Sequence, residues 1–212
     1  MLLTVCPIAQ LPQAFALGES FHRHHPGVPF VIGLADDPAR LPAGVTSPYP
    51  LLGIDCVAGD VLSLSVQYTP TEFIAACKPS FIRAALAQYP DQPSLLYLDP
   101  TGYVYQPLQP VYDRLLTGNL LLTPHLIRPP KDDRHPDEKH LQNIGLYASG
   151  FLGFRRSAET DRMLAWWQQR VTERAFIDYC EGYCADQIWL MHVPVFFEGV
   201  MIAKEPTWHV GL

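Results

Sequence analysis

One acidic residue directly follows an apolar run, at a position that suits ligand binding. Residues 94–98 (SLLYL) lead straight into Asp99. A continuous apolar run is typical of a strand buried on both faces of a parallel sheet, and such sheets bind ligands beyond the carboxyl ends of their strands. Asp99, with the Thr101 hydroxyl two residues on, is therefore a candidate ligand for a divalent ion. The alternative is that Asp99 caps the turn before Gly102.

Two further candidates lie toward the C-terminal end. His209 precedes Val-Gly, where an imidazole could complete a Mn²⁺ site; the alternative is a partly buried histidine with a satisfied hydrogen bond. Asp186 and Gln187 open a short predicted helix over residues 186–192. Asp186 is there either an N-cap or a carboxylate at a pocket rim, available for acceptor binding or acid/base work. On residue type alone, the hydrogen-bonded histidine and the cap are the commoner arrangements.

Two basic residues on one predicted helix are candidates for phosphate contact. Lys78 and Arg83 lie within residues 69–88, and neither has an acidic residue four positions away. They are either cations pointed at a phosphate or part of a solvated helix face. The motifs GxxxxGK[ST] and GxGxxG are missing from the sequence, so P-loop and Rossmann chemistry are not supported. The lack of a GxSxG elbow argues against an α/β-hydrolase.

The hydrophobic pattern predicts the elements that must position these residues. Residues 2–6 and 29–35 are predicted strands, and residues 13–25 between them are a predicted helix that ends at Pro26-Gly27. Strand, helix and strand in this order form a βαβ unit, which starts a parallel sheet. The remaining predicted strands are residues 51–54, 94–99, 120–123, 147–155 and 193–203. The remaining predicted helices are residues 69–88, 107–116, 158–173 and 186–192.

Prolines and charges mark two departures from regular structure. Pro79 lies inside the predicted helix 69–88 and is expected to break or kink it. Residues 128–142 are crowded with charged side chains and prolines. We predict an exposed loop there, of the kind that can serve as a lid.

The amino-acid composition limits which classes of protein the chain can belong to. The 212 residues, 48% of them hydrophobic and 17% charged, predict one globular domain. The net charge of −6 argues against a nucleic-acid binder, which needs a basic face. The five cysteines follow no framework spacing, which favours free thiols and a cytoplasmic location. No signal-peptide pattern and no run of about 20 apolar residues is present, so we expect no transmembrane segment.

Several stretches in succession carry a resemblance. They are KPSFIRAALAQYP (78–90), LLYLDPTGYVYQPL (95–108), LLTPHL (121–126), NIGLYASGFLGFRRS (143–157), MLAWWQQRV (163–171) and CADQIWL (184–190). Their order and spacing resemble GT-A-fold glycosyltransferases. They are similar to the glycogenin-like and lipopolysaccharide-galactosyltransferase group (family eight) and to related bacterial nucleotide-sugar transferases. The second stretch resembles the family's strand ending in Asp-x-Asp, the fourth its Gly-x-x-Asn-Ser-Gly-Phe strand, and the last its Asp-Gln motif.

The resemblance implies a fold, an activity and a set of site residues. It implies one α/β domain over residues 1–212, GT-A-like, with a mixed, mainly parallel sheet flanked by helices. It implies a cytoplasmic bacterial enzyme that moves a sugar from a nucleotide-diphosphate sugar, most simply a UDP-sugar, to an unidentified acceptor. The metal would be Mn²⁺ or Mg²⁺, and its implied ligands are Asp99, Thr101 and His209. The implied donor-binding residues are Lys78, Arg83, Asp36, Ser149 and Gly150. The residues implied in catalysis, near the sugar or the acceptor, are Asp186 and Gln187.

Three departures from the family pattern bear on whether the implied enzyme is active. Thr101 stands where the family has the second acid, which predicts weak metal binding. Ala148 stands where the family has Asn before Ser-Gly-Phe, and the sequence ends at Leu212 where relatives continue. Two hypotheses follow: a glycosyltransferase, or a non-catalytic or impaired module of the same fold that binds a nucleotide or a partner. A third, a flavodoxin-like protein, is disfavoured because the phosphate loop is missing.

Overall fold

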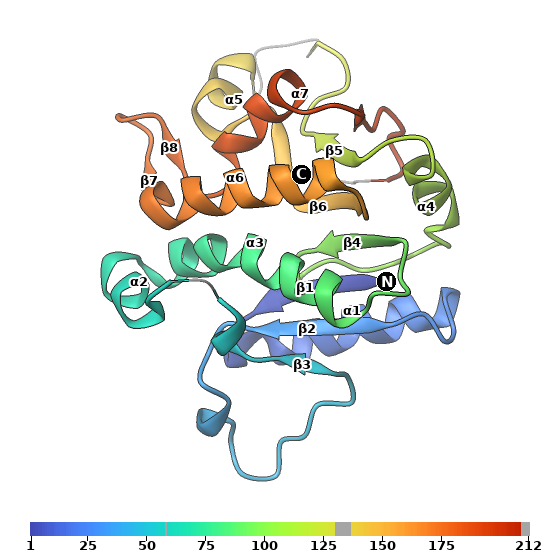
Figure 1. The fold of residues 1–212 in the computed structure, drawn as a ribbon, viewed down its shortest axis with the longest axis vertical. Helices are drawn as coiled ribbons and strands as arrows, with labels where there is room; N and C mark the ends of the chain where they lie inside the picture. Colours follow the sequence, from blue (N-terminus) through green and yellow to red (C-terminus); the bar gives the residue numbers. More distant parts are fainter. Residues whose placement is uncertain (58, 130–136, 209–212) are drawn as a thin grey trace.

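A seven-stranded sheet runs through the centre of the molecule (Figure 1). The computed structural model describes residues 1–57, 59–129 and 137–208. The strands stand in the order β3-β2-β1-β4-β6-β5-β9. In chain order they are β1 (Leu2–Cys6), β2 (Phe30–Leu34), β3 (Leu51–Leu52), β4 (Ser94–Leu98), β5 (Leu120–Pro124), β6 (Tyr147–Arg155) and β9 (Val200–Ile202). A separate hairpin joins β7 (Ile177–Asp178) and β8 (Tyr183–Cys184).

Strand directions confirm the mixed, mainly parallel sheet. Strand β1 pairs in parallel with β2 and β4, β2 with β3, and β5 with β9. Strand β6 runs antiparallel to both of its neighbours, β4 and β5. The carboxyl ends of β1, β2 and β4 therefore lie at one edge of the sheet, which we call the carboxyl edge.

Helices cover both faces of the sheet. On one face α3 (Pro70–Gln88) and α6 (Ala158–Arg174) lie side by side, and on the other lie α1 (Leu11–His24) and α4 (Gln109–Leu115) (Figure 1). Alternate residues of β1 enter the two buried clusters: Leu3 faces α3 and α6, and Leu2 faces α1. The strands are thus buried on both faces, as their continuous apolar runs predict. The other α-helices of the described residues are α2 (Val61–Gln67), α5 (Glu138–Ile144) and α7 (Val193–Phe196), and short 3-10 helices lie at Ile8–Gln10, Pro38–Arg40, Ile54–Cys56 and Ile188–His192.

Helix α3 begins with a capping box and is not broken at Pro79. The Glu72 carboxylate accepts hydrogen bonds from the Thr69 amide at 2.8 Å and from the Thr69 hydroxyl at 2.7 Å. The backbone amide at the start of the helix thus has an acceptor. It also accepts from the Ile177 amide at 2.6 Å and so ties the β7–β8 hairpin to α3. Pro79 was expected to break or kink the helix; it does not break it, because α3 continues through this position. Residues 75–82 are all buried against the sheet and α6, and these contacts hold the helix together.

Two other predictions need correction. Residues 128–142 were expected to form an exposed loop, but α5 begins at Glu138, where the Asp137 carboxylate caps it by accepting from the His140 amide at 2.7 Å. Residues 130–136 lie outside the described residues. Residues 193–203 were expected to be strand, but the first part forms α7, whose first turn contains Pro194, a favourable position for proline. Within the described ranges, no helix is long and apolar enough to cross a bilayer.

Candidate functional site

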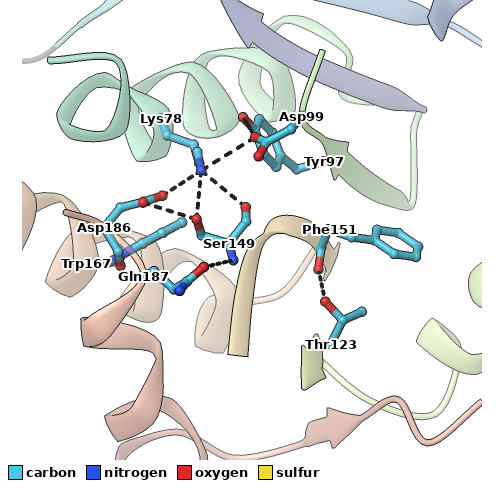
Figure 2. Close-up of polar contacts among 9 residues, drawn as sticks. All are labelled: Lys78, Tyr97, Asp99, Thr123, Ser149, Phe151, Trp167, Asp186 and Gln187. Atoms are coloured by element: carbon cyan, nitrogen blue, oxygen red, sulfur yellow. Dashed lines mark hydrogen bonds and ion pairs between the residues drawn. The ribbon is translucent and has the colours of Figure 1, made fainter. Parts of the chain in front are cut away.

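A buried lysine joins three segments that are far apart in the sequence. The Lys78 ammonium of α3 lies 2.6 Å from Oδ2 of Asp186 and 3.8 Å from Oδ1 of Asp99. It also donates to the backbone oxygen and to the hydroxyl of Ser149, both at 3.2 Å (Figure 2). The Lys78 side chain is 5% exposed. The ammonium thus makes two hydrogen bonds to Ser149 and ion pairs with two carboxylates, and we call Lys78, Asp99, Ser149 and Asp186 the lysine cluster.

Asp186 is held from both its side chain and its backbone. Oδ1 accepts a hydrogen bond from the Ser149 hydroxyl at 3.1 Å, and the backbone oxygen accepts from the Trp167 indole of α6 at 3.0 Å. The preceding residue, Ala185, has a φ of 45°, a left-handed conformation that a residue with a Cβ adopts only under constraint. Asp186 is therefore no N-cap: its carboxylate is 5% exposed and faces Lys78.

An irregularity in β6 turns Ser149 toward Lys78. Leu122 of β5 pairs with Leu152, but the next pair is Thr123 with Ala148, so residues 149–151 are left out of that ladder. The freed Phe151 oxygen accepts from the Thr123 hydroxyl at 2.8 Å (Figure 2). The freed Ser149 oxygen faces the ammonium instead. Bulges of this kind occur next to active sites because they re-aim side chains.

Gln187 completes the support of the bulge. Its side-chain oxygen accepts from the Ser149 amide at 3.2 Å, and its side-chain amide donates to the Ile144 oxygen at 2.8 Å. Both ends of this side chain are thus engaged in holding β6 to the end of α5. In this structure Gln187 orients Ser149 and its neighbours.

Asp99 is the accessible member of the lysine cluster. It follows β4 at the carboxyl edge, and its side chain is 46% exposed. Oδ1 accepts a hydrogen bond from the Tyr97 hydroxyl at 2.7 Å. Its backbone amide donates to the Gly150 oxygen at 2.9 Å, and the turn closes by a backbone bond from the Gly102 amide to the Asp99 oxygen. The predicted strand end is confirmed, and the carboxylate faces a cation rather than capping the turn.

Charge is arranged unevenly across the lysine cluster. Burial alone would lower the pKa of Lys78, but Asp186 and Asp99 outweigh it and raise that pKa above its ordinary value. Burial, together with Asp99, raises the pKa of Tyr97 well above its ordinary value, so its hydroxyl stays protonated and can donate. One ammonium thus faces two carboxylates. The group carries a formal net charge of −1, with the accessible part of that charge on Asp99.

Two further predicted residues follow strands β2 and β4 on the side of the carboxyl edge. Asp36 follows β2 and accepts a hydrogen bond from the Ile8 amide at 2.7 Å. It therefore lies, like Asp99, beyond the carboxyl edge. Thr101 is exposed, two residues after Asp99.

Two predicted site residues do not join the group. The Arg83 guanidinium donates to the side-chain oxygen of Gln168 on α6 at 2.9 Å. Together with Gln168 it lines a surface groove of about 610 Å³, and no member of the lysine cluster lines that groove. Arg83 therefore bridges α3 and α6 and does not point at Asp99. His209 lies outside the described residues.

Sequence reasoning missed Tyr97 and Trp167. Both were counted only as apolar residues of a strand and a helix, yet each donates a hydrogen bond within the site. The alternation of a strand offered a signal for Tyr97, since residues 97 and 99 point to the same side. Nothing local indicates Trp167, which lies 19 residues before its partner Asp186.

Comparison with known proteins identifies the fold. No protein-family model matches the chain. Among curated proteins the chain is similar to the uncharacterized protein YfnF of Bacillus subtilis (strain 168). The two are 24% identical over 151 residues, which is 71% of this chain and 50% of YfnF. The chain thus spans about half the length of this curated relative.

Solved structures of glycosyltransferases share the architecture. The glycosyltransferase GlyE of Streptococcus pneumoniae TIGR4 matches with a TM-score of 0.57 and 12% identity, over 99% of this chain and 46% of GlyE. A glycosyltransferase involved in glycosylation of the major capsid of PBCV-1 matches with a TM-score of 0.54 and 10% identity, over 97% of this chain and 81% of that one. The chain therefore has the GT-A fold of these glycosyltransferases.

Proposed function

We propose that the protein is a glycosyltransferase that takes its sugar from a nucleotide-diphosphate sugar, with a UDP-sugar as the first candidate. The fold shared with GlyE and the viral glycosyltransferase supports this class of reaction. The observation that carries the proposal is the half-exposed Asp99 carboxylate at the carboxyl edge, where sheets of this kind bind their ligands. The acceptor is left unassigned.

A divalent ion, Mn²⁺ or Mg²⁺, belongs to this proposal. The described residues contain no group of three or more His, Cys, Asp or Glu that could hold such an ion alone. The Asp99 carboxylate and the nearby Thr101 hydroxyl suit an ion that keeps several waters and takes other ligands from substrate phosphates. His209 is a further proposed ligand. When bound, such an ion neutralises charge on the leaving diphosphate.

The charge of the lysine cluster supports joint binding of ion and diphosphate. Lys78 lies closer to Asp186, at 2.6 Å, than to Asp99, at 3.8 Å, and one ammonium cannot neutralise both carboxylates, so a negative charge remains and its accessible part lies on Asp99. A diphosphate alone would be repelled by that carboxylate. We therefore expect nucleotide and metal to bind together more tightly than either does alone.

The cluster also suggests roles for the remaining residues. Ser149 and Gly150 would line the floor beneath the sugar, because the β6 bulge places them beside Asp99. Asp186 and Gln187 would serve the reaction by holding that floor in place, and Asp36 would lie near the nucleoside. Lys78 would act within the protein, because its ammonium is buried, donates two hydrogen bonds to Ser149 and is paired with Asp186.

A non-catalytic binding module of the same fold is the second candidate. Two observations favour it: Thr101 replaces the second acid of the resembled motif, and neither Lys78 nor Arg83 is directed at a phosphate. The two candidates differ in turnover. Slow release of UDP from UDP-sugars in the presence of Mn²⁺ would favour the transferase, whereas tight binding without any release would favour the module.

A thermal-shift screen tests the proposed ligand class. UDP, GDP, CMP and their sugars are added with and without Mn²⁺, and the melting temperature is measured. A nucleotide present at about a hundred times its Kd stabilises the folded state by ~2.7 kcal/mol. We expect a uridine nucleotide to raise the melting temperature with Mn²⁺; no rise with any nucleotide would remove the main support for the proposal.

Restoring the second acid should strengthen the metal site. In Thr101→Asp, a second carboxylate two residues after Asp99 is added at an exposed position. We expect UDP to bind roughly tenfold more tightly in the presence of Mn²⁺, or ~1.4 kcal/mol, as measured by calorimetry. An unchanged Kd would count against a metal at Asp99.

Adding a methyl group at Gly150 should displace Asp99. A Cβ at this position would lie 2.6 Å from Oδ2 of Asp99, and Gly150 is not among the described glycines with positive φ, so the backbone accepts alanine. In Gly150→Ala we expect the carboxylate to move and Mn²⁺-dependent UDP binding to weaken by roughly fivefold, about 1 kcal/mol. Wild-type binding in this variant would show that the position of Asp99 is unimportant.

A further inference from the structure

We propose that Tyr97 is a positioning residue that fixes the orientation of the Asp99 carboxylate. Tyr97 is fully buried in β4, and its hydroxyl donates to Oδ1 of Asp99 at 2.7 Å. A carboxylate can only accept hydrogen bonds, so the Tyr97 proton defines which oxygen is held. This inference rests on the proposed function, because it concerns the same site.

The held oxygen faces the interior. The Lys78 ammonium lies 3.8 Å from the same Oδ1, and 4.7 Å from the centre of the Tyr97 ring, whose face attracts a cation. Tyr97 and Lys78 together therefore keep Oδ1 of Asp99 turned inward (Figure 2).

The other oxygen occupies space that the lack of a side chain at Gly150 leaves open. A Cβ at Gly150 would lie 2.6 Å from Oδ2 of Asp99. Oδ1 is thus held by a hydrogen bond, and Oδ2 has Gly150 on one side, although 46% of the side chain is exposed. A side chain that is already ordered loses little freedom when it binds a ligand.

This order matters more in a site with one carboxylate. Where two acids share an ion, each compensates for misalignment of the other. Here Thr101 occupies the second position, so Asp99 is the only carboxylate of this motif that could bind the ion. Its orientation therefore depends on the Tyr97 hydroxyl that donates to it. The tyrosine supplies orientation without adding charge to the site.

Tyr97→Phe tests the role because it removes only the hydroxyl. We expect UDP to bind roughly tenfold more weakly in the presence of Mn²⁺, while any binding in EDTA stays unchanged. The matched control is Tyr112→Phe, which changes a partly buried tyrosine of α4 whose hydroxyl donates to the Met1 oxygen at 3.1 Å. An unchanged Mn²⁺-dependent Kd in Tyr97→Phe, or an equal loss in Tyr112→Phe, would overturn the positioning role.

Repeating Tyr97→Phe in the Thr101→Asp variant distinguishes a loss of carboxylate orientation from a general disturbance of the fold. In Thr101→Asp, where two acids would share the ion, Tyr97→Phe should weaken binding by only about twofold. The same tenfold loss in that background would mean that the hydroxyl does not act through the orientation of a lone carboxylate.

A ligand-free measurement separates this inference from the proposed function. Urea unfolding of wild type, Tyr97→Phe, Asp99→Ala and the double variant gives their stabilities. A loss in the double variant that is smaller than the sum of the two single losses shows that Tyr97 and Asp99 are coupled, whereas additive losses would overturn the inference. If wild type binds no nucleotide, the proposed function fails, and this cycle alone decides whether Tyr97 holds Asp99.

Discussion

Replacing Lys78 by methionine is expected to lower the free energy of unfolding by about 3–5 kcal/mol, because it leaves a buried carboxylate without its cation. Asp186 and Lys78 are each 5% exposed, and their charged atoms are 2.6 Å apart. Removal of the ammonium also leaves the Ser149 backbone oxygen of the β6 bulge without its donor. Urea unfolding followed by circular dichroism measures the loss.

A double variant separates charge from volume. Lys78→Met combined with Asp186→Leu removes both charges, and replacement of a whole buried pair by apolar residues is often close to neutral. We expect the double variant to recover most of the stability lost in Lys78→Met. Arg83→Met is the control on the same helix; because its exposed guanidinium bonds only Gln168 among the described contacts, a small loss is expected. A small loss in Lys78→Met would contradict the buried ion pair.

Replacing Asp99 by asparagine is expected to weaken UDP binding in the presence of Mn²⁺ by roughly a hundredfold, or about 2.7 kcal/mol. The change keeps the shape of the side chain and an oxygen that accepts from Tyr97. It removes the one accessible charge of the lysine cluster. Calorimetric titration of UDP into each protein at fixed Mn²⁺ gives the Kd values.

The control for this change is another exposed aspartate. Asp113 lies on α4, on the opposite face of the sheet from α3, and among the described contacts its carboxylate accepts only a local hydrogen bond from Gln109, at 2.7 Å. Asp113→Asn should bind UDP as wild type does, although it alters the net charge equally. Equal Kd values for wild type and Asp99→Asn would exclude Asp99 from the ligand site.

The fold and the place of Asp99 were predictable because both depend on local pattern. The apolar run of residues 94–98 made β4 a buried strand, and the acid after it had to lie at the carboxyl edge. The same logic placed Asp36 after β2. Local pattern was misleading at Pro79, because burial of residues 75–82 against the sheet and α6 outweighs the hydrogen bond that proline cannot donate.

The partners within the site were not predictable in the same way. Lys78 and Asp186 are 108 positions apart in the chain and meet only because α3 and the segment after β8 approach each other beside β6. No spacing rule relates residues at such a distance, so Lys78 was expected to face phosphate or solvent. The β6 bulge at residues 149–151 is equally invisible in the sequence, because its cause is the change of register against β5.

The most direct measurement of the central claim is a calorimetric titration of UDP into the wild-type protein, with Mn²⁺ and then with EDTA. The claim is that the carboxyl edge beside Asp99 binds a nucleotide diphosphate together with a divalent ion. It predicts saturable binding of one UDP per chain in Mn²⁺ and at least tenfold weaker binding in EDTA, or a difference of ~1.4 kcal/mol or more. The same Kd in both buffers, or no heat of binding in either, would contradict it.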